Sequence, residues 1–326
     1  MYAKEYGQAI TRRNVLKVLG SLAAGAGAGG GLLAAGCAST SHNDGPQVKW
    51  SKGTELPRTR VPADACDSHH HIYDSRYPWA PEVVLKSGDA TVADYKKLQQ
   101  RLGTTRNVIV QPSGYGIDNR LLVESIAAFN GRARGVAVVN AKVTDAELQR
   151  LNAAGVRGIR FNLQQTGATT VDMVQPLATR IAAMGWHVQI NAPTDIIYQA
   201  RDVWARLPCP VVFDHLAHVN QTSDPVFAMV LGLMQSGRGW VKLSGFYIDT
   251  KVGPPGYDDQ VAVASAYAQA VPGRCVWGSD WPHPTEQAEK GVPDDAVLLD
   301  AFARAVPTEA VRKQILVDNP SRLYFS

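Results

Sequence analysis

The chain has 326 residues, of which 45% are hydrophobic and 19% are charged, a composition that supports a full core and argues against disorder. Its formal net charge is +4, but four basic residues and one acidic residue lie within residues 1–37. The 29 basic and 28 acidic residues of the remainder nearly balance and form no basic run. The charge therefore gives no reason to expect a nucleic-acid partner.

The first 37 residues are typical of a targeting segment, which is separate from the fold. Arg12 and Arg13 precede a soft apolar run, Val18–Gly36, in the order of a twin-arginine export signal. The run leads into Leu33-Ala34-Ala35-Gly36-Cys37, which resembles a lipobox in which the Cys37 thiol accepts a lipid. Cleavage without a lipid and a retained anchor are the alternatives. We expect an exported protein that is periplasmic, or anchored through its leader or a lipid on Cys37 and facing the periplasm.

Residues 38–60, rich in Ser, Thr, Pro, Lys and Gly, predict a flexible tether ahead of one catalytic domain, residues 61–326. Within that domain Cys66, Cys209 and Cys275 lie at or beside apolar runs and lack C-x-x-C spacing, which argues against a zinc ribbon. We predict three buried thiols. Cys66 and Cys275 would lie on neighbouring strands of a closed barrel, so they are the one pair to test for a disulfide.

From residue 64 onward, short β-branched runs alternate with amphipathic stretches, a pattern typical of β-α units on a parallel sheet. Eight such units in about 260 residues predict an α/β fold of the (β/α)8 TIM-barrel type, with a doubly wound sheet as the alternative. The predicted helices include residues 91–102, 118–129, 144–154 and 171–184. The predicted strands are residues 65–71, 106–112, 135–140, 156–163, 186–191, 210–215, 239–244 and 274–279.

Most of the predicted strands end in side chains that can titrate, form hydrogen bonds or bind a metal. In such barrels the active site lies at the carboxyl ends of the strands, so these side chains would meet in one place. One polar strand end is more often structural than catalytic, but so many together favour an active site. The ends are Asp67–His71, Gln111–Ser113, Arg160–Asn162, Gln189–Asn191, Asp214-His215, Ser244 and Ser279–Trp281.

The alternation of side chains along a strand selects among these residues. His69 and His71 are two residues apart and point to the same face, whereas His70 points outward to the helices. By the same rule Arg160 and Asn162 share a face, and Arg157 lies on the other. We therefore predict structural roles for His70 and Arg157.

The chain resembles the second amidohydrolase family, and within it the 2-pyrone-4,6-dicarboxylate lactonase-like branch of lactone hydrolases. Asp-x-His-x-His on the first strand is common to the superfamily, whereas the second-strand block and the Gly-Ser-Asp-Trp-Pro-His block of the eighth strand are more specific. The resemblance spans essentially all of the mature chain. The residues that carry it are Asp67–Asp74, Tyr77–Trp79, Gln111–Asn119, Gly158–Asn162, Asp214-His215, Lys242–Gly245, Trp277–Pro284 and Asn319–Tyr324.

The chain departs from the metal-dependent members of the superfamily. These usually add a His at the end of strand five, and dinuclear members add a Lys or Glu on strand four. Asn191 and Arg160 stand there instead, and His187 lies too early in its strand. The lactonase branch includes members that resemble a metal-free design, so the resemblance favours an enzyme that requires no cofactor. One zinc or manganese ion at His69, His71 and Asp280 is the alternative.

A second departure concerns the substrate. In the dicarboxylate lactonases, arginines after the strand-six His and after the strand-seven Ser-Gly turn clamp carboxylates, a task that suits a guanidinium group. The matching positions hold His218 and Ile248. Arg160 remains and could hold one carboxylate. We therefore expect a mono-acid or neutral lactone, such as a sugar lactone, in place of the dicarboxylate.

The resemblance and the strand ends together imply a mechanism. Asp280 takes a proton from the attacking water, while His69, His71 and His215 polarise the lactone carbonyl or hold a metal that does so. Arg160 and Asn162 orient the substrate, a small lactone or carboxylic acid. Weaker candidates for substrate contact are Tyr115, Asn119 and Tyr247, and the expected aromatic walls of the pocket are Trp79 and Trp281.

Two other functions remain open from the sequence. One is a metal-dependent decarboxylase or amidohydrolase of the same superfamily, which would require tightly bound zinc or manganese. The other is a non-catalytic binding lipoprotein. It is the weakest of the three, because Asp280, His69 and His71 are all present.

Overall fold

The computed structural model describes residues 44–81, 83–164, 167–287 and 291–326. The predicted export signal, Cys37 and the first residues of the predicted tether lie outside this range. Across the described residues, every helix is too short or too polar to span a lipid bilayer.

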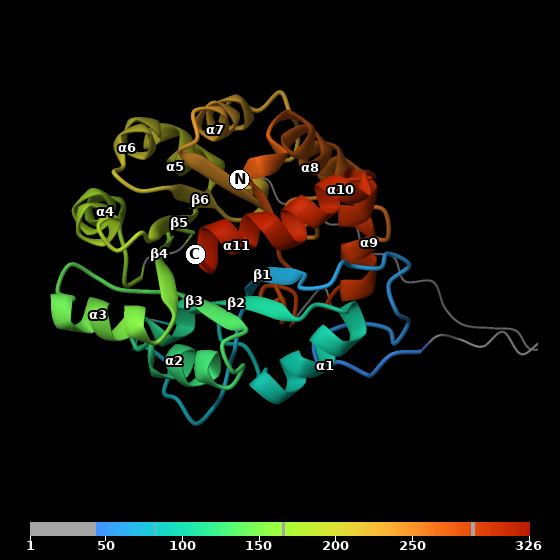
Figure 1. Ribbon diagram of the computed structural model, residues 1–326, viewed down its shortest axis with the longest axis horizontal. Coiled ribbons are helices and arrows are strands. Elements are labelled where there is room, and N and C mark those ends of the chain that lie inside the picture. The colour runs from blue at the N-terminus through green and yellow to red at the C-terminus, as the bar shows by residue number, and fades with distance from the viewer. Residues whose placement is uncertain (1–43, 82, 165–166, 288–290) are drawn as a thin grey trace, which may run out of the picture. The chain divides into compact units, whose positions relative to one another are not determined.

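The described residues contain one sheet of eight parallel strands, arranged in space in their chain order (Figure 1). This order confirms the (β/α)8 barrel, because a doubly wound sheet reverses its strand order in the middle. Each strand overlaps its predicted range. The strands are β1 (Cys66–His70), β2 (Arg106–Val110), β3 (Ala133–Ala137), β4 (Val156–Asn162), β5 (His187–Asn191), β6 (Val211–Phe213), β7 (Gly239–Leu243) and β8 (Cys275–Trp277).

Backbone hydrogen bonds between β1 and the segment after β8 bring the two edges of the sheet together. The Asp280 N–H donates to the His69 carbonyl at 2.8 Å, and the His71 N–H donates to the Trp281 carbonyl at 2.8 Å. Gly278 allows this approach, because a Cβ at this position would lie 2.5 Å from the Cβ of His69. The closure places the ends of the first and last strands side by side.

Helices surround the barrel, and their ends follow local sequence signals. Thr91 caps the first helix, since its side chain accepts from the Asp94 N–H while the Asp94 carboxylate accepts from the Thr91 N–H. The helices of the described residues are α1 (Val92–Leu102), α2 (Arg120–Ala127), α3 (Asp145–Ala153), α4 (Val174–Ala182), α5 (Thr194–Gln199), α6 (Arg201–Arg206), α7 (Pro225–Gln235), α8 (Asp258–Ala270), α9 (Asp295–Ala305), α10 (Glu309–Lys313) and α11 (Asn319–Tyr324).

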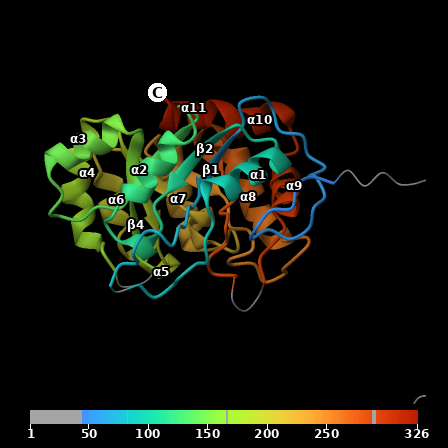
Figure 2. The ribbon, with the colours of Figure 1, turned by 90° about the horizontal axis from the view of Figure 1, so that it is seen from below.

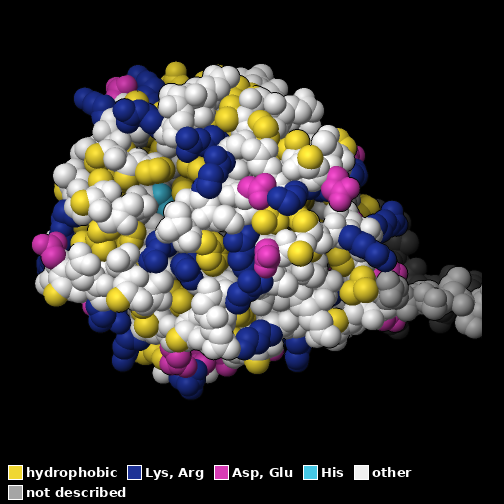
Figure 3. Space-filling view, viewed as in Figure 1, with side chains coloured by type: hydrophobic (Ala, Val, Ile, Leu, Met, Phe, Trp, Pro, Cys, Tyr) yellow, Lys and Arg dark blue, Asp and Glu magenta, His cyan; other side chains and the backbone are white. Residues whose placement is uncertain are grey.

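The C-terminal helix α11 covers the amino-terminal end of the barrel. The Asn319 amide donates to the Cys275 carbonyl at the start of β8, and Leu323 and Tyr324 join the apolar cluster inside the strands. Figure 2 shows α10 and α11 at one end of the barrel, and Figure 3 looks onto this covered end. The carboxyl ends of the strands, which carry the predicted site, lie at the opposite end.

Residues 44–60 pack on the barrel, contrary to the predicted flexible tether. Val48 is buried, and the Trp281 indole donates to the Lys49 carbonyl at 2.7 Å. The Arg101 guanidinium of α1 donates to the Lys52 and Glu55 carbonyls. Side chains of the domain therefore satisfy the backbone of a polar segment, which its composition does not reveal.

The three described cysteines, Cys66, Cys209 and Cys275, are buried and free, as predicted. Their environment is apolar, and burial raises the pKa of the Cys66 thiol to about 12. They are small hydrophobic residues of the core rather than a disulfide or a metal site.

Candidate active site

The histidines of β1 point in alternate directions. The Nε2 atoms of His69 and His71 lie 3.4 Å apart inside the strand ends. The His70 ring faces the helices, where it stacks on Tyr95 of α1 at 3.5 Å between centroids and lies 3.0 Å from the Asn107 amide oxygen. His70 is therefore a packing residue, as the two-residue period of a strand predicts.

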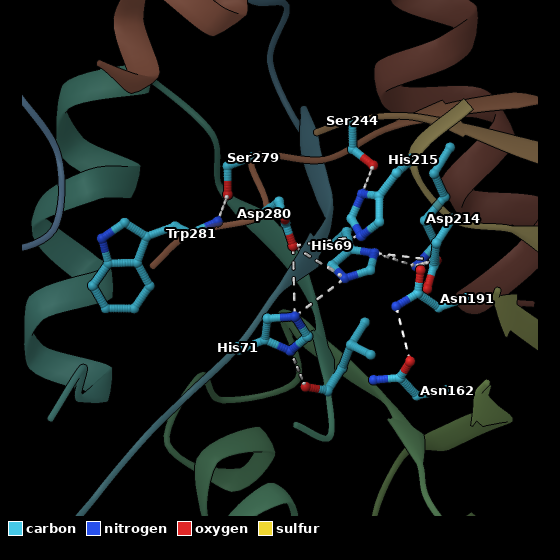
Figure 4. Close-up of polar contacts among 12 residues, drawn as sticks. His69, His71, Asn162, Asn191, Asp214, His215, Ser244, Ser279, Asp280 and Trp281 are labelled. Atoms are coloured by element: carbon cyan, nitrogen blue, oxygen red, sulfur yellow. Dashed lines mark hydrogen bonds and ion pairs between the residues drawn. The ribbon is translucent and has the colours of Figure 1, made fainter. Parts of the chain in front are cut away.

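Asp280 lies among three histidines at the end of β8 (Figure 4). Its Oδ1 atom is 3.4 Å from Nε2 of His69, 3.5 Å from Nε2 of His71 and 3.8 Å from Nε2 of His215. Asp280 and His215 both have positive φ, +62° and +48°, which is strained backbone for residues with a Cβ. The structure therefore brings together all four predicted catalytic side chains.

The electrostatics of the cluster favour an ionised Asp280 and oppose protonation of His69 and His215. Burial opposes ionisation of Asp280, but the histidines outweigh it and hold its pKa well below the ordinary value. Burial also lowers the pKa of His215 to about 4 and keeps the pKa of His69 well below its usual range. At neutral pH Asp280 can accept a proton.

Tyr247 reaches the cluster from the loop after β7. Its hydroxyl donates to Oδ2 of Asp280 at 2.6 Å and is buried. The sequence suggested Tyr247 as a substrate contact, whereas the structure pairs it with the carboxylate. A donor to the ionised form stabilises that form and fixes its orientation, with Oδ1 toward the histidines.

A buried charged network behind His69 was missed by the sequence analysis. The Lys242 ammonium donates to the Ser68 carbonyl and the Gln189 amide oxygen, and it lies 3.3 Å from Nδ1 of His69. Asp214 Oδ1 is also 3.3 Å from this nitrogen. Burial lowers the pKa of Lys242 to about 8. A lysine inside the otherwise apolar run of a strand was the available signal.

His215 is supported from β7. Its Nδ1 lies 3.1 Å from the Ser244 hydroxyl, and Nε2 is directed at Asp280. Gly245 leaves room for the ring, because a Cβ there would lie 2.7 Å from Nδ1. Residues that follow β7 therefore orient a histidine that follows β6.

The cluster opens into a cavity of about 350 Å³, a size typical of small-molecule sites. Arg160 is buried at its floor, where Nε donates to Asp214 Oδ2 at 3.0 Å. The Asn162 amide donates to the Ser113 hydroxyl and accepts from the Asn191 amide. His71, Arg160, Asn162, His215 and Asp280 all line this cavity.

Other predicted residues serve the scaffold. The Asn119 amide donates to the Val138 carbonyl and accepts from the Val138 N–H, so it anchors the loop after β2. Tyr115 donates to the Asp74 carbonyl and stacks on Trp79 at 4.9 Å between centroids. Trp281 is fully buried. Tyr115, Asn119, Trp79 and Trp281 lie outside the residues that line the cavity.

Arg157 and His187 lie away from the cavity, and Arg157 has the structural role that the strand alternation predicted. Arg157 lies on β4 with its guanidinium turned to the end of α3, where it donates to the Asn152 carbonyl. His187 is buried at the start of β5 against Tyr324, far along the strand from the carboxyl ends. Neither residue lines the cavity.

The donor set of the cluster fits one divalent metal ion. Ligand atoms of His69, His215 and Asp280 lie within 4.8 Å of one another, and His71 Nε2 is close to the same point. In a tetrahedral zinc site with bonds of about 2.0–2.1 Å, ligand atoms lie about 3.4 Å apart. The Val110 carbonyl can only accept, so it keeps the His71 proton on Nδ1 and leaves Nε2 free to bind.

The fold and the site define a (β/α)8 barrel with one carboxylate among three histidines at the carboxyl ends of its strands. The model of the amidohydrolase family matches residues 66–325, so the chain belongs to this family. It is 36% identical over 293 residues to 2-pyrone-4,6-dicarboxylate hydrolase of Comamonas testosteroni, covering 85% of this chain and 95% of that one. It is 33% identical over 272 residues to 4-sulfomuconolactone hydrolase of Rhizobium radiobacter, covering 81% and 91%.

A solved structure extends the similarity. The probable 2-pyrone-4,6-dicarboxylic acid hydrolase of Acinetobacter baumannii, with citric acid bound, has a TM-score of 0.70 and 25% identity. The match covers 81% of this chain and 100% of that one. These similarities confirm the branch that the sequence motifs indicated.

Proposed function

We propose that the chain hydrolyses a lactone or a related cyclic ester in the cavity above Asp280. The observation that carries the proposal is the Asp280 carboxylate held within 3.8 Å of three imidazoles at the floor of the cavity. Hydrolysis of a cyclic ester needs a base for water and a group that stabilises the oxyanion. The named activities of the two relatives support the same chemistry.

The roles of the side chains follow from their contacts. Oδ1 of Asp280 accepts a proton as the water oxygen attacks the lactone carbonyl carbon. His69, His71 and His215 polarise the carbonyl and stabilise the negative charge that develops on its oxygen. The ring C–O bond then breaks, and the leaving alkoxide takes the proton from Asp280. Tyr247 holds Asp280 in place through the 2.6 Å hydrogen bond.

The charges in the cavity support a substrate with at most one carboxylate. Arg160 is the only Lys or Arg among the described residues that line it, and its Nε is already bonded to Asp214. The Asp249 carboxylate also lines the cavity, and its Oδ2 atom lies 2.8 Å from Nδ1 of His218. A dicarboxylate would place its second charge without a guanidinium partner. A mono-acid or neutral lactone fits better.

A panel of lactones tests this function. Acid release should be measured with a neutral lactone, a monocarboxylate lactone and 2-pyrone-4,6-dicarboxylate, each with wild type and Asp280→Asn. We expect turnover of the first two, slower turnover of the dicarboxylate, and loss of activity in the variant. Turnover of none of them would remove the proposal and favour a binding protein.

A metal-dependent reaction is the second candidate, because Nε2 of His69, Nε2 of His71 and Oδ1 of Asp280 lie 3.4–3.5 Å apart, the spacing of a tetrahedral zinc site. A divalent ion bound by His69, Asp280 and either His71 or His215 would act as a Lewis acid toward the substrate carbonyl. Metal content after gentle purification, followed by chelation, separates the two. Full activity after the metal is removed supports the metal-free enzyme. Loss of activity, restored by zinc or manganese, supports a metal-dependent enzyme.

We also propose that the protein is exported, on the basis of Arg12 and Arg13 ahead of the apolar run. The twin-Lys variant should stay in the cytoplasm of the same cells, whereas the wild type should reach the periplasm. Unchanged export of the variant would remove the twin-arginine assignment. Labelling with a radioactive fatty acid, compared between wild type and Cys37→Ala, tests the lipid.

A further inference from the structure

One side of the cavity is apolar. It is formed by the loop after β1 and the end of β2, and we call it the apolar wall. Val84 lines the cavity and is 73% exposed, which is unusual for a valine with apolar neighbours on the same surface. The apolar wall consists of Ala80, Val83, Val84, Leu85 and Pro112.

Another side is polar and is built from the ends of β4 to β7. Asn162 and Asn191 lie beside each other there, joined by a 3.1 Å hydrogen bond (Figure 4). His218 lies 2.7 Å from the Asn191 amide oxygen, and Asp249 pairs with His218. Because neighbouring strands contribute neighbouring loops, these polar groups gather on another side of the cavity than the loop after β1, with Asn162 nearest to the end of β2 through its hydrogen bond to Ser113.

The apolar wall is braced from behind. The Ala80 N–H donates to the Gly114 carbonyl at 2.8 Å, which ties the loop after β1 to the loop after β2. Trp79 stacks on Tyr115 with an interplanar angle of 5°, and the Tyr115 hydroxyl accepts from the Asp74 N–H. The wall is therefore formed before a ligand binds, which reduces the entropic cost of binding.

We propose that the apolar wall binds an alkyl substituent on the lactone ring, while the polar side binds the ring oxygens. This inference rests on the proposed lactone hydrolysis and adds the class of substrate, an alkyl-substituted lactone with at most one carboxylate. Each methylene that leaves water contributes about 0.8 kcal/mol, which corresponds to about fourfold in affinity. Two or three buried methylenes would therefore favour the substituted lactone by about 15- to 60-fold.

A matched pair of substrates tests the proposal. δ-Valerolactone and δ-decalactone share one ring and differ by a pentyl chain. We expect kcat/KM for δ-decalactone to exceed that for δ-valerolactone by at least about tenfold. A ratio near one, or a preference for the dicarboxylate pyrone, would overturn the alkyl site while leaving lactone hydrolysis intact.

Two exposed valines provide the variant and its control. Val84→Ser should reduce the ratio of the two kcat/KM values by about three- to tenfold, because it replaces two methyl groups of the apolar wall with a hydroxyl. Val252 is 62% exposed, follows β7 and does not line the cavity, so Val252→Ser should leave the ratio unchanged. An equal change in both variants would contradict a site at the wall.

Direct binding separates this inference from the proposed function. Calorimetry with the Asp280→Asn variant measures the affinities of both lactones without turnover. Tighter binding of δ-decalactone, weakened by adding Val84→Ser, supports the alkyl site even if the wild type hydrolyses neither compound. Equal affinities would overturn it whatever the reaction.

Discussion

Replacing Asp280 by Asn tests the mechanism most directly. The amide keeps the size of the carboxylate and its place among His69, His71 and His215, whose Nε2 atoms lie 3.4, 3.5 and 3.8 Å from Oδ1. It removes the negative charge and the site that accepts the proton of water. Loss of a general base lowers the rate by about 10²–10⁴-fold, which corresponds to about 3–5 kcal/mol in activation free energy. We expect kcat to fall in this range, with KM and the free energy of unfolding nearly unchanged.

The control is His70→Ala, which is adjacent to His71 in the chain but lies on the opposite face of β1. His70 packs on Tyr95 and bonds to Asn107, so its loss creates a cavity and leaves a buried amide unpaired. These effects together cost about 2–4 kcal/mol of stability. Steady-state kinetics and denaturant unfolding should show a less stable enzyme with ordinary kcat. Near-normal turnover in Asp280→Asn, combined with inactivity of folded His70→Ala, would refute both the mechanism and the assignment of faces.

Four more variants test single contacts and the candidate metal site. Tyr247→Phe should raise the pKa of Asp280, because it removes a donor to the ionised form, and should move the acid limb of the kcat/KM profile upward by about one pH unit. A fall that is equal at every pH would instead make Tyr247 a substrate contact. Asn119→Ala should lower the free energy of unfolding by about 2–4 kcal/mol while kcat/KM is retained, since it unpairs buried backbone groups. For the metal-dependent candidate, calorimetry should show one zinc ion bound by wild type and by His70→Gln but none by His69→Gln; equal binding by both variants would place the ion elsewhere.

The sequence predicts eight parallel strands and the floor of the site because both follow from short periods, although the same periods also allow a doubly wound sheet. Apolar runs define the strands, and parallel strands share one carboxyl end. The two-residue period then separates His69 and His71 from His70. These inferences need no knowledge of how distant segments pack. Asp280 and His215 could therefore be placed at the carboxyl end of the barrel from their positions at strand ends alone.

The remaining contacts depend on loops and on distant parts of the chain. Tyr247 meets Asp280 across 33 residues, and nothing local distinguishes it from Tyr115, which turns to Asp74 instead. Lys242 is in a strand whose neighbours are apolar, but its partners come from β1, β5 and β6. Residues 44–60 have the composition of a tether, but distant groups hold them on the barrel. Arg101 and Trp281 donate to their carbonyls, and Asp300 accepts from the N–H groups of Arg58 and Thr59.

The first residue of the Asp-x-His-x-His motif explains why the cluster can form at the seam of the barrel. Asp67 does not face the cavity: Oδ1 accepts from the N–H groups of His69 and Ser279, and Oδ2 accepts from the hydroxyls of Ser279 and Tyr95. Burial raises the pKa of Asp67 to about 6, and these donors favour the ionised form that remains at neutral pH. One carboxylate therefore joins β1, the end of β8 and α1. Because His69 and Asp280 stand on the two strands that it joins, the distance between the base and its imidazole partner is set by a residue that touches neither water nor substrate.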